Sequence, residues 1–426
     1  MRASETSPPL LNRWTVAAAV AGNTLEFYDF LTYSTFAVFI GQAYFPSGSA
    51  FASLLLTLAT FGVGFVTRPL GGLILGAYAD RAGRRPALVL TITLMTAGTL
   101  ALALTPTYGT IGVLAPLILI AGRLVQGLAL GGDFGPATAL LLECAPAGRR
   151  ALFVSWQNAS QGIAICAAGL VGLLLSLLLP VQQLAQWGWR LAFAVGLLIV
   201  PVGLYMRRRL PETLEAPGSH GGRAVLGLLW RRHRQLVVLG VLIILCLTVT
   251  AYLTSYMTTY ALTSLGMATS DAMLATITTG VFMGAGALWG GQLSDRFGIT
   301  PVMIVPRIVL TLAVYPAFLL LVKFPRTGVL VGVTALITTL GALSAAAATA
   351  ALAAAFPNSV RSSGTAVCYA ASVSIFGGTT QFVITWLIGV TGDRLAPAYY
   401  LIAASLVSLW AMFRLPGQHR LERVLI

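Results

Sequence analysis

The sequence predicts an all-α membrane protein with twelve transmembrane helices in two pseudo-symmetric six-helix bundles. Three observations lead to this prediction. Of the 426 residues, 57% are apolar and only 9% are charged, whereas soluble domains carry about 25% charged residues. The chain divides into about twelve apolar runs, each roughly 20 residues long, which is the length that spans the hydrocarbon of a bilayer. A charged turn also recurs at a corresponding place in each half of the chain.

The recurring turn reads GAYADRAGRRP at 76–86, and a less complete copy, GQLSDRFGITP, occupies 291–301. The aspartates of the two copies are 215 positions apart (295 − 80). A second pair of landmarks keeps nearly the same offset, since Arg150 and Arg361 each follow a proline by four residues. Two halves built to one plan indicate a duplicated membrane bundle.

Each predicted span is an apolar run that stops at a cluster of charged or helix-breaking residues. The outer turns, such as YFPSG at 44–48 and TPTYG at 105–109, are short. One long polar stretch, 209–234, carries two arginine clusters and the sequence PGSHGG. We therefore predict bundles at 1–208 and 235–426, joined by this cytoplasmic linker. The predicted spans are 15–41, 52–79, 87–105, 109–142, 151–178, 189–208, 235–263, 270–296, 301–322, 327–356, 361–390 and 396–414.

The formal charge of +14 does not indicate nucleic-acid binding. The basic residues lie in short loops between spans, not on one face with interleaved aromatic residues. With the first terminus placed inside, twenty Lys and Arg residues, Arg307 among them, fall in cytoplasmic segments and four fall in outer loops. The four outer residues are Arg190, Lys323, Arg326 and Arg394. This asymmetry predicts a multi-pass protein of the plasma (inner) membrane with both termini in the cytoplasm.

The sequence argues against an enzyme, because it contains no nucleophile–base set, metal cluster or phosphate loop, and no cofactor is expected. The four cysteines lie within or at the ends of apolar runs and lack metal-ligand spacing. The three histidines all fall in predicted cytoplasmic segments. An intramembrane proton carrier must therefore be a carboxylate, and the candidates are Glu26, Asp29 and Asp133.

The first predicted span holds two carboxylates on one helix face. Glu26 and Asp29 are three residues apart, and Tyr33 follows four residues later. A charge at the bilayer centre costs roughly 2.5–3.5 kcal/mol on insertion scales. Two neighbouring carboxylates repel each other, which favours protonation of one of them and a role in proton coupling. The alternative is that both are simply paired with buried arginines.

Two arginines lie inside predicted spans. Arg68 precedes Asp80 by twelve residues, roughly 18 Å along a helix, and so falls near mid-membrane. It either pairs with a carboxylate of the first span or binds an anionic substrate. In the fourth span Gln126 and Asp133 are seven residues apart on one face, and Arg123 flanks that face. Arg123 is either a substrate contact or a structural support.

Neutral polar side chains complete the candidate substrate site. In the fifth span Gln157 and Gln161 share a helix face, as do Asn158 and Gln161. Amides suit the recognition of carboxylates and hydroxyls, but they also hold helices together. The second half has no carboxylate deep in a span, and its polar contributions include Tyr256 and Gln381. We therefore expect coupling in the first half and a substrate held between the halves.

The charged turn, its copy and the two later landmarks predict a cytoplasmic gate. Glu143 lies at the cytoplasmic end of the fourth span, where it can join the neighbouring arginines. The predicted gate residues are Gly76, Asp80, Arg81, Gly83, Arg84, Arg85, Glu143, Arg150, Asp295 and Arg361.

The spacing Gly-x-x-x-Asp-Arg-x-Gly-Arg-Arg between two spans resembles the signature loop of the major facilitator superfamily. Arg-x-x-Gln-Gly in the fourth span is similar to a second motif of that superfamily. Further stretches resemble its metabolite:proton symporters, and among them the citrate and tricarballylate importers. These stretches are GNTLEFYDF at 22–30, RPLGG at 68–72, GRLVQG at 122–127, WQNASQ at 156–161, WGWR at 187–190, FGG at 376–378 and TGD at 391–393.

This resemblance implies the major facilitator fold, alternating access, and uptake of a di- or tricarboxylate with protons as the coupling ion. It also implies that Arg68 and Arg123 are anion contacts, a role that suits a guanidinium because its planar fork donates two parallel hydrogen bonds. The expected partners are a small organic anion and the lipid bilayer, and the protein is expected to be a monomer. The alternatives are a proton-antiporting exporter of apolar or cationic compounds and a non-transporting membrane sensor.

Overall fold

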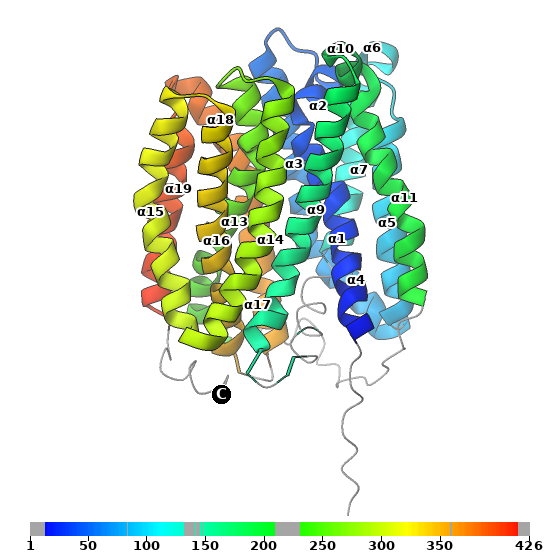
Figure 1. Cartoon of the computed structure of the whole chain (residues 1–426). Coiled ribbons are helices and arrows are strands. Elements are labelled where there is room, and N and C mark those ends of the chain that lie inside the picture. Colours follow the sequence, from blue (N-terminus) through cyan, green and yellow to red (C-terminus); the bar gives the residue numbers. More distant parts are fainter. Residues whose placement is uncertain are drawn as a thin grey trace, which may run out of the picture.

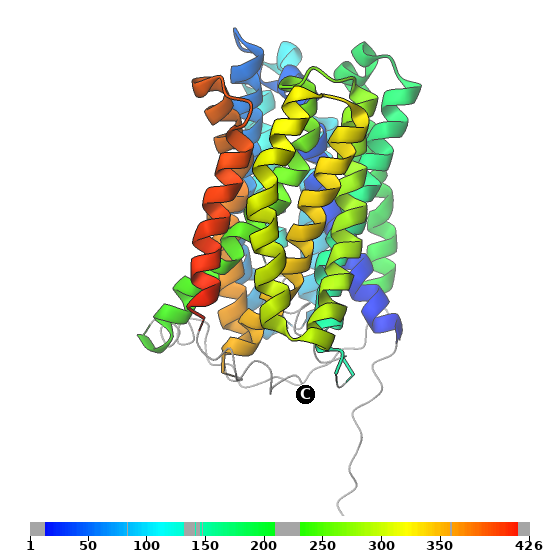
Figure 2. The same ribbon diagram turned by 60° about the vertical axis from the view of Figure 1, so that its left-hand side comes forward.

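The computed structural model describes residues 13–82, 84–131, 141, 145–146, 148–208, 231–357 and 360–415. Every regular element within these ranges is helical, and the long helices run side by side along one axis (Figure 1 and Figure 2). The described chain starts with α1 and finishes with α19 at the same, lower edge of Figure 1. An even number of crossings gives this arrangement.

The helices follow the predicted order. In the first half they are α1 (Arg13–Thr35), α2 (Ala37–Tyr44), α3 (Ala50–Val66), α4 (Arg68–Ala82), α5 (Arg84–Leu104), α6 (Tyr108–Ile111), α7 (Leu114–Leu130), α9 (Arg150–Leu178), α10 (Val181–Gln183), the π-helix η1 (Leu184–Gly188) and α11 (Trp189–Arg208). In the second half they are α13 (Arg234–Thr263), α14 (Thr269–Phe297), α15 (Ile299–Lys323), α16 (Thr327–Ala355), α17 (Arg361–Ser372), the π-helix η2 (Val373–Gly377), α18 (Gly378–Thr391) and α19 (Ala396–Phe413).

Several of these helices continue one another, namely α1 with α2, α3 with α4, α10 and η1 with α11, and α17 and η2 with α18. Counted in this way, the described helices make twelve crossings, as predicted. The sixth crossing begins at Val181, eight residues earlier than its predicted start. The predicted linker lies largely outside the described residues, which resume at 231.

Local sequence explains where two of these helices begin and end. Helix α3 starts after Ser49, whose side-chain oxygen accepts a hydrogen bond of 3.1 Å from the backbone nitrogen of Ala52 and so caps the helix. Helix α14 ends within the second charged turn, where Gly298 has φ of 88°. This left-handed backbone favours glycine, so the glycine of the repeated turn has a conformational role here.

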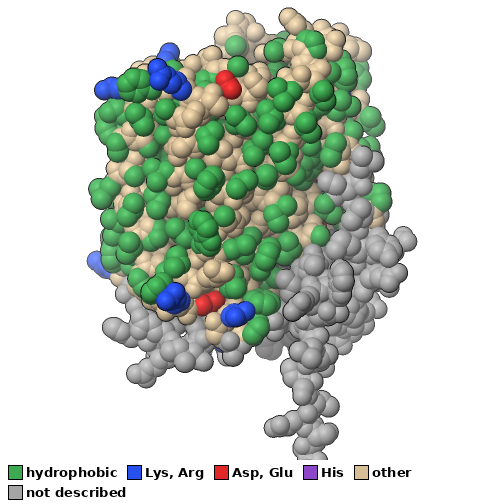
Figure 3. All heavy atoms as spheres, viewed as in Figure 1, with side chains coloured by type: hydrophobic (Ala, Val, Ile, Leu, Met, Phe, Trp, Pro, Cys, Tyr) green, Lys and Arg blue, Asp and Glu red, His purple; other side chains and the backbone are tan. Residues whose placement is uncertain are grey.

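The outer surface suits a lipid environment. Leu104, Leu178 and Leu312 each keep more than 70% of their surface exposed (72%, 75% and 73%), which a water-soluble surface of this extent would not tolerate. Figure 3 shows hydrophobic side chains across the middle of the molecule and charged ones near its upper and lower edges. Eight helical segments of the described chain are long and apolar enough to cross a membrane. The prediction of a multi-pass membrane protein is confirmed.

The two halves meet along α9 and α14, which lie side by side in Figure 1. Glycines permit this approach: a methyl group built at Gly280 would lie 2.2 Å from the backbone nitrogen of Cys166. Helices α3 and α18 meet in the same way, since a methyl group at Gly62 would lie 2.5 Å from the carbonyl oxygen of Gly378. Small residues at these crossings bring backbones of opposite halves into contact.

Candidate functional site

A central cavity lies between the halves, lined by side chains of α1, α9, α13, α14, α16, α17 and η2. None of the described residues that line it is charged. Asn158 and Gln161, predicted as substrate contacts, both line it, and the amide nitrogen of Gln161 has no hydrogen-bond partner. The other polar lining residues are Thr248, Thr250, Tyr252, Thr254, Ser255, Thr338, Thr349 and Tyr369. The wall therefore offers hydroxyl and amide groups to a solute.

Arg68 and Arg123 lie beside this cavity, in an aromatic cage. The cage consists of Phe30, Tyr33, Phe61, Phe65 and Tyr252. The Arg68 guanidinium lies 4.2 Å from the centre of the Phe65 ring and 4.5 Å from that of Phe30. The Arg123 guanidinium lies 3.9 Å from the centre of the Tyr33 ring. Such cation–π contacts contribute about 0.5–2 kcal/mol each, so the rings replace part of the lost hydration.

Tyr252 connects the cage with the cavity. Its ring packs edge-on against Phe65, with the ring centres 5.2 Å apart, while the same residue lines the cavity. The Phe65 ring also lies 4.2 Å from the Arg68 guanidinium, so Tyr252 and Arg68 pack against the same ring. Arg68 and Arg123 are 5% and 0% exposed and do not line the cavity themselves. A solute in the cavity would reach their positive charge across Tyr252.

A chain of hydrogen bonds joins Arg123 to Asp29, and we call it the acid–arginine chain. Arg123 Nη1 donates to Gln126 Oε1 at 2.8 Å, and Gln126 Nε2 donates to Thr99 Oγ1 at 3.0 Å. The Thr99 hydroxyl donates to Asp29 Oδ2 at 2.8 Å. The chain runs through α7, α5 and α1 and so connects Asp29 with Arg123 across three helices. Three of its members were predicted from the sequence.

Sequence reasoning missed Thr99, since nothing distinguishes it from the other threonines of α5. It also missed Gly196 of α11, which makes room for the carboxylate: a methyl group there would lie 1.8 Å from Asp29 Oδ1. That oxygen is buried and has no hydrogen-bond partner. Buried carboxylate oxygens are normally satisfied, so Asp29 has an open position for a proton.

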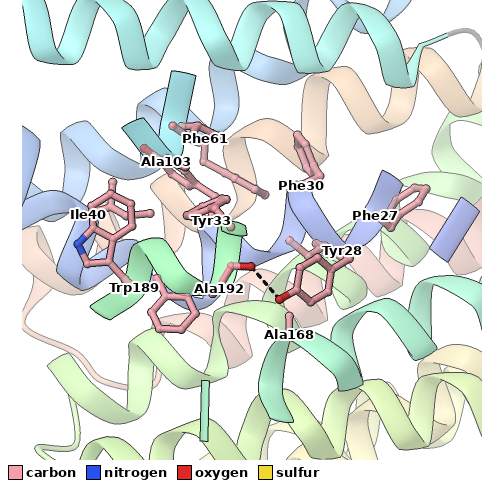
Figure 4. Close-up of a cluster of buried hydrophobic side chains, with 14 of the residues drawn as sticks. Phe27, Tyr28, Phe30, Tyr33, Ile40, Phe61, Ala103, Ala168, Trp189 and Ala192 are labelled. Atoms are coloured by element: carbon pink, nitrogen blue, oxygen red, sulfur yellow. Dashed lines mark hydrogen bonds between the residues drawn. The ribbon is translucent and has the colours of Figure 1, made fainter. Parts of the chain in front are cut away.

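The orientation of Asp29 depends on the aromatic packing of α1. Figure 4 shows Phe27, Tyr28, Phe30 and Tyr33 spreading from this helix among side chains of its neighbours. The Tyr28 hydroxyl donates to the carbonyl oxygen of Ala192 at 2.9 Å, which ties α1 to α11. With its neighbours held in this way, Asp29 faces α5 and α11.

Other predicted residues of the first half have structural partners. The Tyr33 hydroxyl donates to the carbonyl oxygen of Thr57 at 3.1 Å. Gln157 Nε2 donates to Asn23 Oδ1 at 3.3 Å, and this pair joins α9 to α1. Glu26 is buried in α1, with 6% of its surface exposed. Asp133 and Glu143 lie outside the described residues.

In the second half Tyr256 and Gln381 do not line the cavity. The Tyr256 hydroxyl accepts a hydrogen bond of 2.7 Å from Thr385. Gln381 Nε2 donates to Ser34 on α1 at 2.7 Å, so it links the halves. Arg307, which the sequence analysis counted with the cytoplasmic arginines, is completely buried within α15. That assignment was wrong, because this side chain is buried among helices and does not extend to the membrane edge.

Asp295 joins the halves at the lower edge of the molecule. Its two carboxylate oxygens accept hydrogen bonds of 3.0 Å each from the backbone nitrogens of Ala151 and Leu152. These nitrogens belong to the first turn of α9, where unpaired N–H groups and the helix dipole favour an anion. Arg150 is the first residue of the same turn.

The rest of the predicted gate is described less fully. Residues 76–82 of the first charged turn form the end of α4 and residues 84–86 the start of α5, and Gly83 lies outside the described residues. The structure describes only the backbone of Gly76, Asp80, Arg81, Arg84, Arg85 and Arg361.

Comparison with known proteins decides the family. The family model of the Major Facilitator Superfamily matches residues 20–377. This chain belongs to that superfamily. The facilitator is 35% identical over 424 residues to a citrate-proton symporter of Klebsiella pneumoniae, which covers 96% of this chain and 95% of that one. It is 35% identical to a citrate-proton symporter of Salmonella typhi over 403 residues, 93% of this chain and 92% of the relative.

Other relatives of this facilitator carry different solutes. The glycine betaine/proline/ectoine/pipecolic acid transporter OusA of Dickeya dadantii is 32% identical over 412 residues, 93% of this chain and 82% of the relative. Among solved structures, the crystal structure of a D-xylose-proton symporter has a TM-score of 0.75 and 18% identity, over 95% of this chain and 98% of that one. At this identity the likeness concerns the fold alone, and the predicted major facilitator fold is confirmed.

The hydrogen bonds from the first turn of α9 to Asp295 give a prediction that does not depend on the substrate. Asp295→Ala should speed backbone hydrogen exchange at Ala151 and Leu152 by roughly tenfold, since loss of a cap costs about 0.5–2 kcal/mol. Exchange is measured by mass spectrometry on peptides that cover the first turn of α9. Asp271→Ala, at the opposite end of α14, is the control. Unchanged exchange in Asp295→Ala would mean that the contact does not hold the halves together.

Proposed function

We propose that this protein is a proton-coupled symporter that imports an organic acid, a di- or tricarboxylate such as citrate or tricarballylate, by alternating access. The observation that carries the proposal is the acid–arginine chain. Its Arg123 end stands beside Tyr252 of the cavity wall, and its Asp29 end has an open carboxylate oxygen. A proton site and an anion site are thus joined by three hydrogen bonds.

The relatives support the acid as substrate. Two citrate-proton symporters align with nearly the whole chain at 35% identity. Carboxylate is also the one anionic group that citrate shares with proline and glycine betaine, which the more distant relatives carry. The described wall of the cavity has no carboxylate of its own to pair with an ammonium group. Positive charge next to a neutral wall favours a solute whose charges are all negative.

In this mechanism protonation of Asp29 removes its negative charge and weakens its attraction to Arg123. The Arg123 guanidinium, with Arg68 beside it, then attracts a carboxylate in the cavity more strongly. Release of the proton on the other side restores the attraction and favours departure of the anion. The membrane potential contributes about 2.3 kcal/mol per elementary charge per 100 mV to this cycle.

The remaining parts of the proposal follow the sequence. We place the protein in the plasma (inner) membrane as a monomer, with both termini in the cytoplasm and with bundles at 1–208 and 235–426. Glu26 and Asp133 are further candidate proton carriers. Tyr33, Gln126, Gln157, Asn158, Gln161, Tyr256 and Gln381 support the substrate site directly or through the helices that form it.

Uptake of labelled citrate into proteoliposomes tests the proposal. An imposed pH gradient, acid outside, should accelerate uptake by the wild-type protein. Arg68→Ala and Arg123→Ala should each reduce uptake by about 30-fold or more, since loss of a buried charged partner costs roughly 2–5 kcal/mol. Arg414→Ala, an exposed arginine at the end of α19 stacked on Trp410, is the control and should stay within about twofold.

Two outcomes would contradict the proposal. Citrate uptake whose rate does not depend on the pH gradient would contradict the proposed coupling to protons. Efflux of an apolar or cationic dye that survives Arg68→Ala would favour the exporter instead. Size-exclusion profiles of each variant separate loss of transport from loss of folding.

A further inference from the structure

The second half contains a buried cation that the proposed function leaves unused. Arg307 of α15 is 0% exposed. Its Nε donates to Ser344 Oγ at 3.3 Å, and its Nη1 donates to Cys246 Sγ at 2.8 Å and to Thr250 Oγ1 at 3.2 Å. All three of these partners are neutral, and Nη2 has no hydrogen-bond partner at all.

This arrangement is costly for a purely structural residue. A guanidinium stays charged in any protein environment, and an isolated buried charge is strongly disfavoured unless an anion compensates it. Snorkelling cannot relieve the cost, because no part of Arg307 reaches the surface. A neutral side chain would join α15 to α13 and α16 without this cost. The free Nη2 group therefore indicates an anion that arrives from outside the protein.

Only one side chain separates Arg307 from the central cavity. Thr250 accepts from Arg307 Nη1 and also lines the cavity. Its hydroxyl donates to the carbonyl oxygen of Cys246 at 2.6 Å, one turn earlier on α13. Across the cavity, Gln161 lines the same space, is more than nine-tenths buried, and its amide nitrogen lacks a partner. One unpaired donor of the first half thus lines the cavity, and one of the second half lies behind Thr250.

Thr250 and Tyr252 give α13 two distinct flanks. The two residues are two positions apart on the helix, so their side chains point about 160° apart around its axis. Tyr252 leads to Arg68 and Arg123 of the first half, and Thr250 leads to Arg307 of the second. A single carboxylate cannot contact both flanks at once, whereas a molecule with two carboxylates at its ends can.

We propose that Arg307 is a second anion anchor, which binds one carboxylate of the substrate while the Arg68 side of the cavity binds another. The substrate then bridges the two halves and must carry at least two carboxylates. This inference rests on the proposed uptake of a di- or tricarboxylate and assigns one of its carboxylates to the second half of the chain. Monocarboxylates would occupy the Arg68 side alone.

The test compares acids that differ in the number of carboxylates. Isothermal titration calorimetry measures binding of citrate, succinate and butyrate to the purified full-length protein. The wild-type protein should bind citrate and succinate at least about tenfold more tightly than butyrate, a difference of about 1.4 kcal/mol. Arg307→Gln should weaken the binding of citrate and succinate by about tenfold or more and leave the affinity for butyrate within about twofold of the wild-type value. Arg307→Lys, which keeps the charge, should recover part of the loss.

Two further variants separate anchoring from packing. Thr250→Val keeps the buried guanidinium and the side-chain shape but removes the hydroxyl at the cavity wall, and it should weaken citrate and succinate selectively, by roughly fivefold. Its result decides the question if Arg307→Gln does not fold. Ser405→Ala alters a neighbour of Cys246, at 3.1 Å, that is not among the hydrogen-bond partners of Arg307. It should change none of the three affinities.

The possible failures are distinguishable. If the wild-type protein prefers polycarboxylates but Arg307→Gln or Thr250→Val weakens all three acids equally, or none, the anchor is wrong and organic-acid uptake stands. If the wild-type protein binds none of the three acids, both the proposed function and the proposed role of Arg307 are wrong.

Discussion

Asp29→Asn is expected to abolish the accumulation of substrate driven by a pH gradient while leaving counterflow exchange within about threefold of the wild-type rate. The asparagine keeps the shape and can still accept the Thr99 hydrogen bond, but it cannot bind or release a proton. Exchange needs only the reorientation of the loaded carrier, whereas accumulation needs the proton cycle. Both rates are measured in the same proteoliposomes, with and without an imposed gradient.

The surrounding residues supply the controls for Asp29. Thr96→Val should leave both rates unchanged, because the Thr96 hydroxyl bonds to the carbonyl oxygen of Ile92 in its own helix. Gly196→Ala should impair accumulation, since the added methyl group would displace Asp29 Oδ1. If Asp29→Asn still accumulates substrate, another carboxylate carries the proton, and Glu26 and Asp133 become the variants to test.

Gly280→Val is expected to reduce transport at least about tenfold by separating α14 from α9. A methyl group at this position already lies 2.2 Å from the backbone nitrogen of Cys166, and backbone cannot move aside as a flexible side chain can. Overpacking of this kind costs about 1–3 kcal/mol, which corresponds to roughly five- to 150-fold in an equilibrium constant. Uptake rate per folded molecule is the measurement, with folding checked by size-exclusion chromatography.

The matched control for Gly280 is Gly332→Val. Gly332 also lies within a long helix of the second half, yet a methyl group there would meet nothing within 4 Å. It should transport at the wild-type rate. Equal rates for the two variants would show that the close contact of α9 and α14 is not required for the transport cycle.

Composition and the repeated turn were enough to predict the fold. Length and polarity of each apolar run determine where a helix can cross a bilayer, so the twelve crossings follow from the sequence. The interruptions within a crossing could not be predicted from the sequence. The break between α1 and α2 and the early start of α10 depend on packing between helices, which an apolar run does not reveal.

The candidate site was predicted in part. Charges within spans are conspicuous because they are expensive, which is why Asp29, Arg68 and Arg123 stood out. Their neighbours could not be paired from one sequence. Gln157 turned out to join α9 to α1 through Asn23, although as an amide it looked as suited to substrate as Asn158. An amide on a helix face gives the same sequence pattern whether its side chain contacts a solute or another helix.

Thr99 and Gly196 illustrate a different limit. Each acts on Asp29 from another helix, and neither is unusual in its own segment. A threonine in a span usually bonds to its own helix, as Thr96 does and as Thr99 also does through the carbonyl oxygen of Met95, and a glycine usually permits packing. Their roles appear only when three helices are placed around one carboxylate.

The ring of Phe30 lies within 4.7 Å of both buried guanidinium groups, 4.5 Å from Arg68 and 4.7 Å from Arg123. Movement of either cation therefore changes the surroundings of the other. Thermodynamic linkage makes such an effect reciprocal. If an arriving anion tightens the hold on the proton by some factor, the proton tightens the hold on the anion by the same factor, and one phenylalanine is where the two equilibria meet.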